Sequence, residues 1–249
     1  MEQNKKKNRG IKIVLLVLVF IIVGLLIYLI VDRINNKPSD TVIKNTTEIK
    51  KINEDEEYVY DNPKYGDKTV PYVNIDSDDA KSINNKIEKY VDGKASDTWN
   101  ELFYYYYIND NIISILFGNK LGDTINSKYR IYNINVKTGK IVSNKELIDI
   151  KKTNREEIAS SLNETIEKSY GDSIEFAKET TIRYDGEIDL TVYEANKTSI
   201  EGLKVENMKL YLNEKKELCI VFDTFTIAGS MTSEYLYNLD TKNVIKLSM

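Results

Sequence analysis

The longest apolar stretch of the chain runs from Ile13 to Val31 and contains no charged residue. As a helix rising about 1.5 Å per residue, this stretch would be roughly 28 Å long, close to the hydrocarbon thickness of a bilayer. A helix is expected because every backbone polar group inside a membrane must be paired within the segment. The pattern therefore predicts one transmembrane helix.

The residues on either side of this run predict its orientation. Five cations precede it within residues 1–12, whereas Asp32 to Lys37 carries charges of both signs. Because cations favour the cytoplasmic side, the N-terminus should be cytoplasmic and the rest extracellular. The alternative is a cleaved secretory signal, whose apolar region would be about 7–15 residues long and would end at a small-residue cleavage site. The run is longer and lacks such a site, so we expect an uncleaved signal anchor in the cell membrane.

These signals divide the chain into four parts: a cytoplasmic basic tail (1–12), the transmembrane helix (13–31), a flexible stalk (32–53) and an extracellular domain (54–249). The stalk is predicted because its apolar positions follow no period among many polar residues. The acidic run Glu54–Glu57 lacks the alternating ligands and the glycine of a calcium loop, so we interpret it as a solvated edge.

From residue 58 onward, strand and helix patterns alternate. Runs rich in β-forming residues at 58–60 and 69–75 predict two strands. Ser77 or Asp78 can cap a helix that ends near Gly93. We expect the apolar stripe of this helix to pack on the domain's own sheet rather than on a partner, because it would otherwise be an exposed patch. The stripe consists of Ala80, Ile83, Ile87, Tyr90 and Val91.

Residues 102–108 and 112–117 flank an Asn/Asp turn and predict a hairpin. Because side chains alternate along a strand, Tyr104 and Tyr106 share one face, and Phe103, Tyr105 and Tyr107 share the other. One interpretation is an aromatic platform that stacks on sugar rings or on a protein loop. The other, which we favour, buries one face against helices and leaves the other partly wet. The candidate partner-binding residues are Tyr104, Tyr105, Tyr106 and Tyr107.

The rest of the chain is mixed in the same way. Thr153-Asn154-Arg155-Glu156 matches a capping box, and the helix it starts should end at Gly171. The other expected elements are strands at 130–137, 188–193, 208–212, 218–222, 235–237 and 244–247, a helical turn at 143–148, a helix at 173–181 and a linker after residue 193. The predicted fold class is α+β, with an antiparallel sheet whose helices pack on one face, preceded by the single transmembrane helix.

Charge and composition narrow the functional classes. The formal net charge is −4, with +4 in residues 1–12 and −8 in the remainder. An acidic exterior argues against a nucleic-acid partner and permits a basic protein or a cation as the partner. The alternative interpretation is that the acidic surface serves only solubility.

The chain contains no histidine and one cysteine. Ser-His-Asp and Cys-His catalysis, His-ligated zinc and a histidine pH switch are therefore excluded, as is an internal disulfide. Cys219 lies in an apolar run and should be buried and structural. We expect no cofactor and no metal.

Several short strings, taken in order across about residues 58–240, resemble a known family. The strings are Val70-Pro71-Tyr72-Val73; Ile83-Asn84 with Ile87; Ile113-Ser114-Ile115; Tyr132 to Lys140 with Leu147-Ile148; and Met208 to Phe222 with Ala228-Gly229. The family is the extracellular domain shared by the anti-sigma factor RsiV and the N-terminal part of the peptidoglycan deacetylase PdaC. The resemblance implies an α+β recognition domain of Gram-positive cell envelopes, which in receptor-like members binds lysozyme, a basic protein. We expect neither anti-sigma nor deacetylase activity, because the cytoplasmic tail is short and no histidine is present for a metal-dependent deacetylase.

The leading hypothesis is therefore a membrane-anchored recognition domain, not an enzyme, that binds peptidoglycan or a wall-directed protein such as lysozyme. One alternative is a cell-wall hydrolase with paired carboxylates. Its available acids are Asp78, Asp79, Asp185, Glu187 and Asp223. Another alternative is signalling through proteolysis of the stalk.

Overall fold

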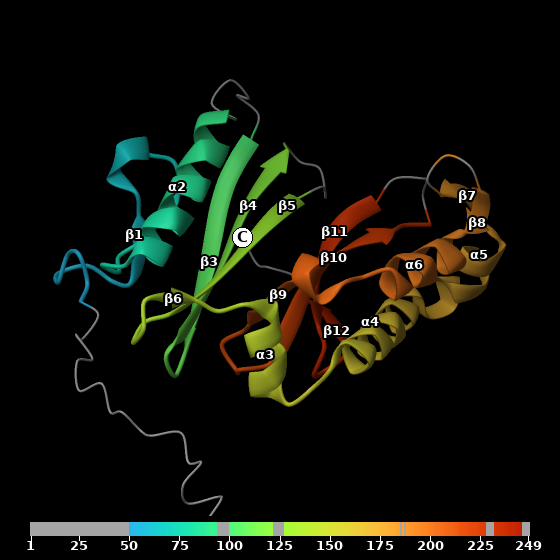
Figure 1. Cartoon of the computed structure of the whole chain (residues 1–249). Helices are drawn as coiled ribbons and strands as arrows, with labels where there is room; N and C mark the ends of the chain where they lie inside the picture. The colour runs from blue at the N-terminus through green and yellow to red at the C-terminus, as the bar shows by residue number, and fades with distance from the viewer. Residues whose placement is uncertain are drawn as a thin grey trace, which may run out of the picture. The chain divides into compact units, whose positions relative to one another are not determined.

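The computed structural model describes residues 50–93, 100–121, 127–184, 186, 188–227 and 232–245 (Figure 1). Within these ranges, no helix is both long enough and apolar enough to cross a membrane. The predicted span Ile13–Val31 lies outside the described residues, as do the predicted cytoplasmic tail and residues 32–49 of the predicted stalk.

The first sheet is antiparallel and four-stranded, in the order β3-β4-β5-β6. Its strands are β3 (Asn100–Asn109), β4 (Ile112–Leu121), β5 (Ser127–Asn135) and β6 (Lys140–Ile141). β3 and β4 form the predicted hairpin, and Asp110 in its turn has a left-handed φ of 52°, a conformation that aspartate tolerates better than most residues. The register places Tyr104 opposite Phe117 and Tyr106 opposite Ile115.

The second sheet is also antiparallel and four-stranded, in the order β12-β11-β10-β9. Its strands are β9 (Lys209–Leu212), β10 (Leu218–Phe225), β11 (Thr232–Asn238) and β12 (Asn243–Ile245). β9 and β10 form the second predicted hairpin. The run Leu218–Phe222 is buried at every position, so β10 is covered on both faces.

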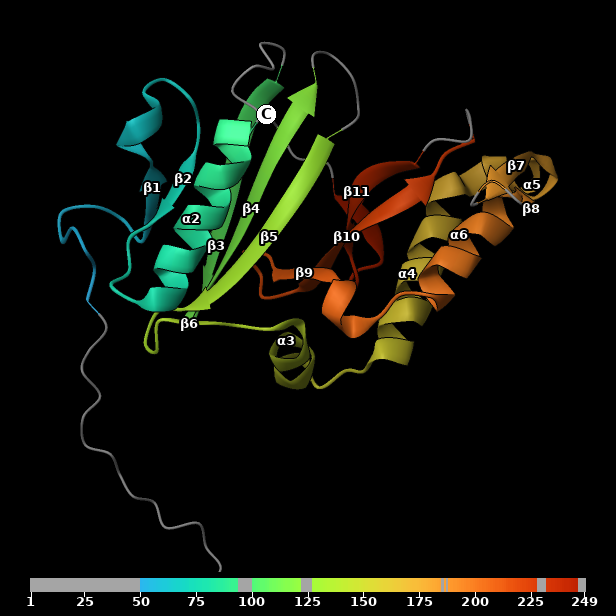
Figure 2. The same cartoon turned by 45° about the horizontal axis from the view of Figure 1, so that its top comes forward.

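Each sheet has a layer on both of its faces. α2 (Asp78–Gly93) lies across one face of the first sheet, where Ile83 and Ile115 share a core (Figure 2). The other face of the first sheet contributes Leu116 to a core shared with Tyr211 and Cys219 of the second sheet. Helices cover the remaining face of the second sheet. The prediction of one main sheet is thus corrected to two four-stranded sheets, because the second hairpin packs on the first sheet instead of extending it.

A small two-stranded sheet lies beside α2. It consists of β1 (Val59–Asp61) and β2 (Pro71–Val73), with the one-turn 3-10 helix η1 (Pro63–Tyr65) between them. Ser77 caps α2, since its Oγ accepts a hydrogen bond from the Ala80 amide at 3.1 Å. Both strands and the helix were predicted from local pattern alone.

The helices on the second sheet are α3 (Asn144–Lys151), α4 (Arg155–Tyr170), α5 (Ile174–Glu179) and α6 (Val192–Glu201), with η2 (Gly171–Ser173) after α4 and η3 (Val205–Asn207) after α6. α4 and α6 lie side by side (Figure 1). The predicted capping box was wrong by one residue: Asn154 caps α4 by accepting the Glu157 amide at 2.9 Å. The Thr153 hydroxyl instead donates to the Glu157 carboxylate at 2.7 Å, and the Thr153 amide bonds to the Ile148 carbonyl at the end of α3.

The longest elements that were not predicted are α6 and β7 (Thr181–Tyr184). α6 occupies the region interpreted as a linker, and β7 pairs with β8 (Ile188–Thr191). A capping box starts α6: Thr191 Oγ1 accepts the Glu194 amide, and the Glu194 carboxylate accepts the Thr191 amide. The predicted strand 188–193 therefore ends at Thr191, where the capping box turns the chain into a helix.

Candidate functional site

β3 presents the four predicted partner-binding tyrosines on two faces. Tyr104 and Tyr106 pack on the edge of the core under α2, and their rings stack with centroids 6.4 Å apart. Tyr105 and Tyr107 pack on the core shared with the second sheet, where Tyr107 stacks on Tyr211. All four are half-buried. Helix α2 thus covers one face in part, whereas the partial cover of the other face by a second sheet was not predicted.

Carboxylates lie at the hydroxyl groups of the pair under α2. The Tyr106 hydroxyl donates a hydrogen bond to Glu57, and the Tyr104 hydroxyl donates one to Asp61. Burial raises the pKa of Tyr104 to about 12, and the negative charges of Asp61 and Glu57 add to that shift. Tyr104 therefore stays protonated at neutral pH, and its phenol acts as a donor to the carboxylate.

Asn74 fixes the acidic run Glu54–Glu57 next to these tyrosines. Its fully buried amide accepts a hydrogen bond from the Asn53 amide at 2.8 Å and donates to the carbonyls of Asn53 and Glu57 at 2.7 and 2.9 Å. The Asn74 side chain is thus hydrogen bonded to the backbone at both ends of the segment 53–57, while the acidic side chains of this segment are exposed. Lys50 and Asn53, which fall in the predicted stalk, are hydrogen bonded to the domain.

The carboxylates of this region have no basic partner within ion-pair distance among the described residues. They belong to Glu54, Asp55, Glu56, Glu57 and Asp61. Elsewhere, Asp223, Glu234 and Asp240 each pair with a lysine. Lys51 donates instead to the backbone carbonyl of Glu56 and lies over the Tyr58 ring. Within the described ranges, negative charge without an ion-pair partner is therefore concentrated beside β3.

Ile108 adds an aliphatic group to the same face of β3. Its side chain is 49% exposed and lies two residues after Tyr106, hence on the same side of the strand. We call the set Glu54–Glu57, Asp61, Tyr104, Tyr106 and Ile108 the acidic-tyrosine surface. The described residues contain no cluster of acidic or sulfur ligands arranged to hold a metal ion. Tyrosine is enriched at protein-binding surfaces, whose rims are polar.

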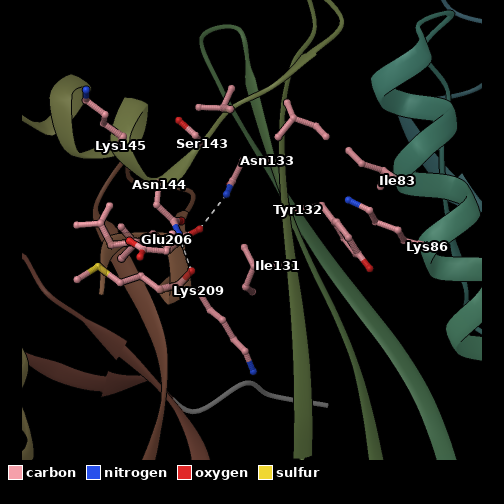
Figure 3. Close-up of a pocket in the computed structure, with 15 residues that line it drawn as sticks. Ile83, Lys86, Ile131, Tyr132, Asn133, Ser143, Asn144, Lys145, Glu206 and Lys209 are labelled. Atoms are coloured by element: carbon pink, nitrogen blue, oxygen red, sulfur yellow. Dashed lines mark hydrogen bonds between the residues drawn. The ribbon is translucent and has the colours of Figure 1, made fainter. Parts of the chain in front are cut away.

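A groove of about 690 Å³ lies between α2, β5 and the segment from η3 to β9 (Figure 3). Two side-chain amides that line the groove already have hydrogen-bond partners within the protein. Asn133 donates to the Leu210 carbonyl at 2.9 Å, and Asn144 donates to the Met208 carbonyl at 2.6 Å. Lys86 and Lys145 line different walls, and their ammonium groups are not brought together (Figure 3). The polar groups of this groove thus join the two sheets and do not converge on a ligand.

The acids of the hydrolase alternative are not assembled into a pair in the part of the chain that is described. Asp78 and Asp79 begin α2, where Asp79 accepts the Ile141 amide at 2.9 Å. Asp223 lies on β10 and pairs with Lys128. Asp185 and Glu187 lie outside the described residues.

Cys219 is fully buried, as predicted, between the two sheets. Burial raises the pKa of its thiol to about 12, so the reactive thiolate is absent at neutral pH.

Sequence reasoning missed three residues of this region: Asn74, Glu57 and Asp61. Asn74 did give a signal, because it is a polar residue inside the otherwise apolar run Val70–Ile75. For Glu57, the sequence contains no signal that points to β3. Glu57 lies 49 residues before Tyr106, and the two side chains come together only in the folded chain.

Comparison with known proteins assigns no family. No family model matches the chain, and no curated protein or solved structure matches it. The resemblance drawn from the sequence strings stays a prediction, and the acidic-tyrosine surface carries the functional argument.

Proposed function

We propose that this chain is a membrane-anchored, extracellular recognition domain of a Gram-positive cell envelope that binds a basic, wall-directed protein such as lysozyme. The single observation that carries the proposal is the acidic-tyrosine surface, where carboxylates that have no basic partner in the described part of the chain lie beside half-exposed tyrosines. The predicted anchor and the net charge of −8 after residue 12 agree with it.

The chemistry of the surface favours arginine and lysine on the partner. Carboxylates form charge-assisted hydrogen bonds with these side chains, and tyrosine faces attract the same cations. Exposed Ile108 offers a small apolar contact at the margin. Complementary charge of this kind accelerates association and selects against acidic partners.

The test is the binding of lysozyme to the full chain in nanodiscs of zwitterionic lipid. We expect saturable binding that is roughly tenfold weaker at about 300 mM salt than at about 50 mM, because exposed charges are screened. The variant Glu56→Gln/Glu57→Gln/Asp61→Asn should weaken binding at low salt and lose most of the salt dependence. Insoluble peptidoglycan is tested in parallel by co-sedimentation.

A matched control removes the same charge far from the surface. Glu164→Gln/Glu175→Gln/Asp189→Asn alters exposed acids on α4, α5 and β8, at the other end of the domain from β1 (Figure 1). It should leave lysozyme binding unchanged. Equal weakening by both triple variants would mean that only net charge matters and would remove the acidic-tyrosine surface from the proposal. Binding to peptidoglycan alone would contradict a basic protein as the partner.

A further inference from the structure

The outer edge of β3 has no strand beside it in the described part of the chain. β3 ends the sheet order β3-β4-β5-β6 and pairs only with β4. No backbone hydrogen bond joins its other edge to any described segment. Every second residue of β3 therefore directs an amide and a carbonyl away from the sheet.

β3 also lacks the usual features that protect an edge strand. Its pairing with β4 is continuous from Asn100 to Asn109 without a bulge. The strand contains no proline and no lysine, and its central run Leu102–Ile108 is aliphatic and aromatic. Natural edges are normally shortened, charged or bulged to prevent pairing with another chain. A ten-residue edge of this composition is suited to accept a further strand.

Charge decides which strand fits. The acidic turn Glu54–Glu57 and Asp61 lie on the α2 side of β3, at the hydroxyls of Tyr106 and Tyr104. On the opposite side, the negative charge of Glu214 acts on Tyr107. A strand placed along β3 would have acidic groups near both of its faces. A second copy of this chain would bring its own acidic turn to the same place and would be repelled.

We propose that β3 binds an extended basic segment of the partner as an additional strand of the first sheet. The inference rests on the proposed function and specifies how that same surface recognises its partner. Backbone hydrogen bonds to β3 supply affinity, and lysine or arginine side chains on the strand reach the carboxylates.

The experiment uses the full chain in zwitterionic nanodiscs and the peptide Ac-KVKVKVKV-NH2 as the probe. Two further peptides carry backbone N-methyl groups, one at every lysine and the other at every valine. In a strand, the amides of alternate residues face opposite edges, so only one methylated set would face β3. We expect one methylated peptide to lose roughly tenfold or more in affinity and the other to bind as the parent does. Hydrogen exchange should slow in β3 when the parent peptide binds.

Two controls test whether binding depends on the positive charge of the peptide and on the carboxylates of the acidic-tyrosine surface. The peptide Ac-EVEVEVEV-NH2 should not bind, and Glu56→Gln/Glu57→Gln/Asp61→Asn should weaken binding of the lysine peptide. Strand addition would be overturned if both methylated peptides bound as tightly as the parent peptide. It would also be overturned if both lost affinity to the same extent. If the chain forms a dimer and the peptide dissociates that dimer, the edge of β3 binds a second copy of the chain. This outcome would also overturn the proposal.

The two proposals fail separately. If lysozyme binds but the lysine peptide does not, strand addition is wrong and the proposed function stands. If the peptide binds with the expected sidedness but lysozyme does not, strand addition stands and lysozyme is excluded as the partner.

Discussion

At the scale of single residues, buried asparagines join elements that are distant in the sequence. The Asn84 amide accepts from the Val73 amide at 2.8 Å and donates to its carbonyl at 3.0 Å, so α2 pairs with β2 as a neighbouring strand would. Asn196 binds the amide and the carbonyl of Phe225 in the same way and joins α6 to β10. An amide carries both a donor and an acceptor and can therefore substitute for a missing backbone neighbour.

Asn84→Ala should destabilise the domain strongly. Removing the amide leaves two buried backbone groups of Val73 without partners, and we expect a loss of about 2–4 kcal/mol in the free energy of unfolding. The neighbouring Asn85→Ala is the matched control, because Asn85 is exposed and should change stability by less than about 0.5 kcal/mol. Urea denaturation followed by circular dichroism measures both. Similar midpoints for the two variants would show that the Asn84 bonds contribute little.

Alkaline titration should distinguish buried tyrosines, whose pKa is raised, from exposed tyrosines. Burial raises the pKa of Tyr104 and of Tyr170 from 10.0 to about 12. Because the folded state favours the neutral phenols, their contribution to stability is complete below pH 10 and is lost as the pH rises through 12. Phenolate absorbance should therefore rise in two phases, the later one coinciding with unfolding. A single phase near pH 10, with the fold still intact, would contradict this burial.

At the scale of elements, one glycine of β4 makes room for an aromatic ring of β3. Gly118 lies opposite Phe103, and a Cβ atom there would be 2.6 Å from the Phe103 Cζ and 3.2 Å from the Lys128 carbonyl. The Phe103 ring lies over this bare backbone and contacts Tyr105 and Tyr129 edge to face. The glycine thus allows an aromatic cluster between the two sheets.

Gly118→Ala should cost about 1–3 kcal/mol, because the methyl group displaces the Phe103 ring. Adding Phe103→Leu should recover part of this loss, since leucine lacks the ring atoms that clash. Gly93→Ala is the control, because a Cβ atom at that position would have no neighbour within 4 Å. Thermal unfolding of the parent, Gly118→Ala, Phe103→Leu, the double variant and Gly93→Ala tests the coupling. Strictly additive effects of the two substitutions would mean that the ring is not what the glycine accommodates.

At the scale of the whole domain, one buried carboxylate joins the two sheets. Glu234 on β11 has a side chain only 5% exposed. It accepts from Lys209 of β9 at 2.5 Å and from the Tyr129 amide of β5 at 2.6 Å, with Lys128 at 3.8 Å. The sheets are therefore joined by charge as well as by the apolar core around Leu116.

Glu234→Ala should destabilise the domain by about 1.5–3 kcal/mol, because it removes the buried carboxylate that accepts hydrogen bonds from Lys209 and from the Tyr129 amide. Glu164→Ala breaks an ion pair of the same 2.5 Å length, with Lys242, but Glu164 is 58% exposed. That control should cost less than about 1 kcal/mol. Urea denaturation compares them, and equal losses would contradict the role assigned to burial.

The sequence alone was a good guide wherever a local pattern decides the structure. The stripe of α2, the hairpin β3–β4 and the alternation of Tyr104 and Tyr106 followed from spacing, because helix and strand periods are properties of neighbouring residues. The missed helix α6 also has a local start signal, Thr191 with Glu194 three positions later. The apolar run of β10 likewise indicated a strand with Cys219 buried in it.

The sequence by itself determined the acidic charge, most strands and helices and the class of the fold, and it predicts the membrane anchor. Only the tertiary structure decided that the long strands form two four-stranded sheets and that the acidic turn lies beside β3. The physical reason is that these arrangements depend on contacts between distant segments: Glu57 with Tyr106 across 49 residues, and Asn133 with Leu210 across 77. A local period says which face of a strand is apolar, but the packing of the whole chain selects what covers it.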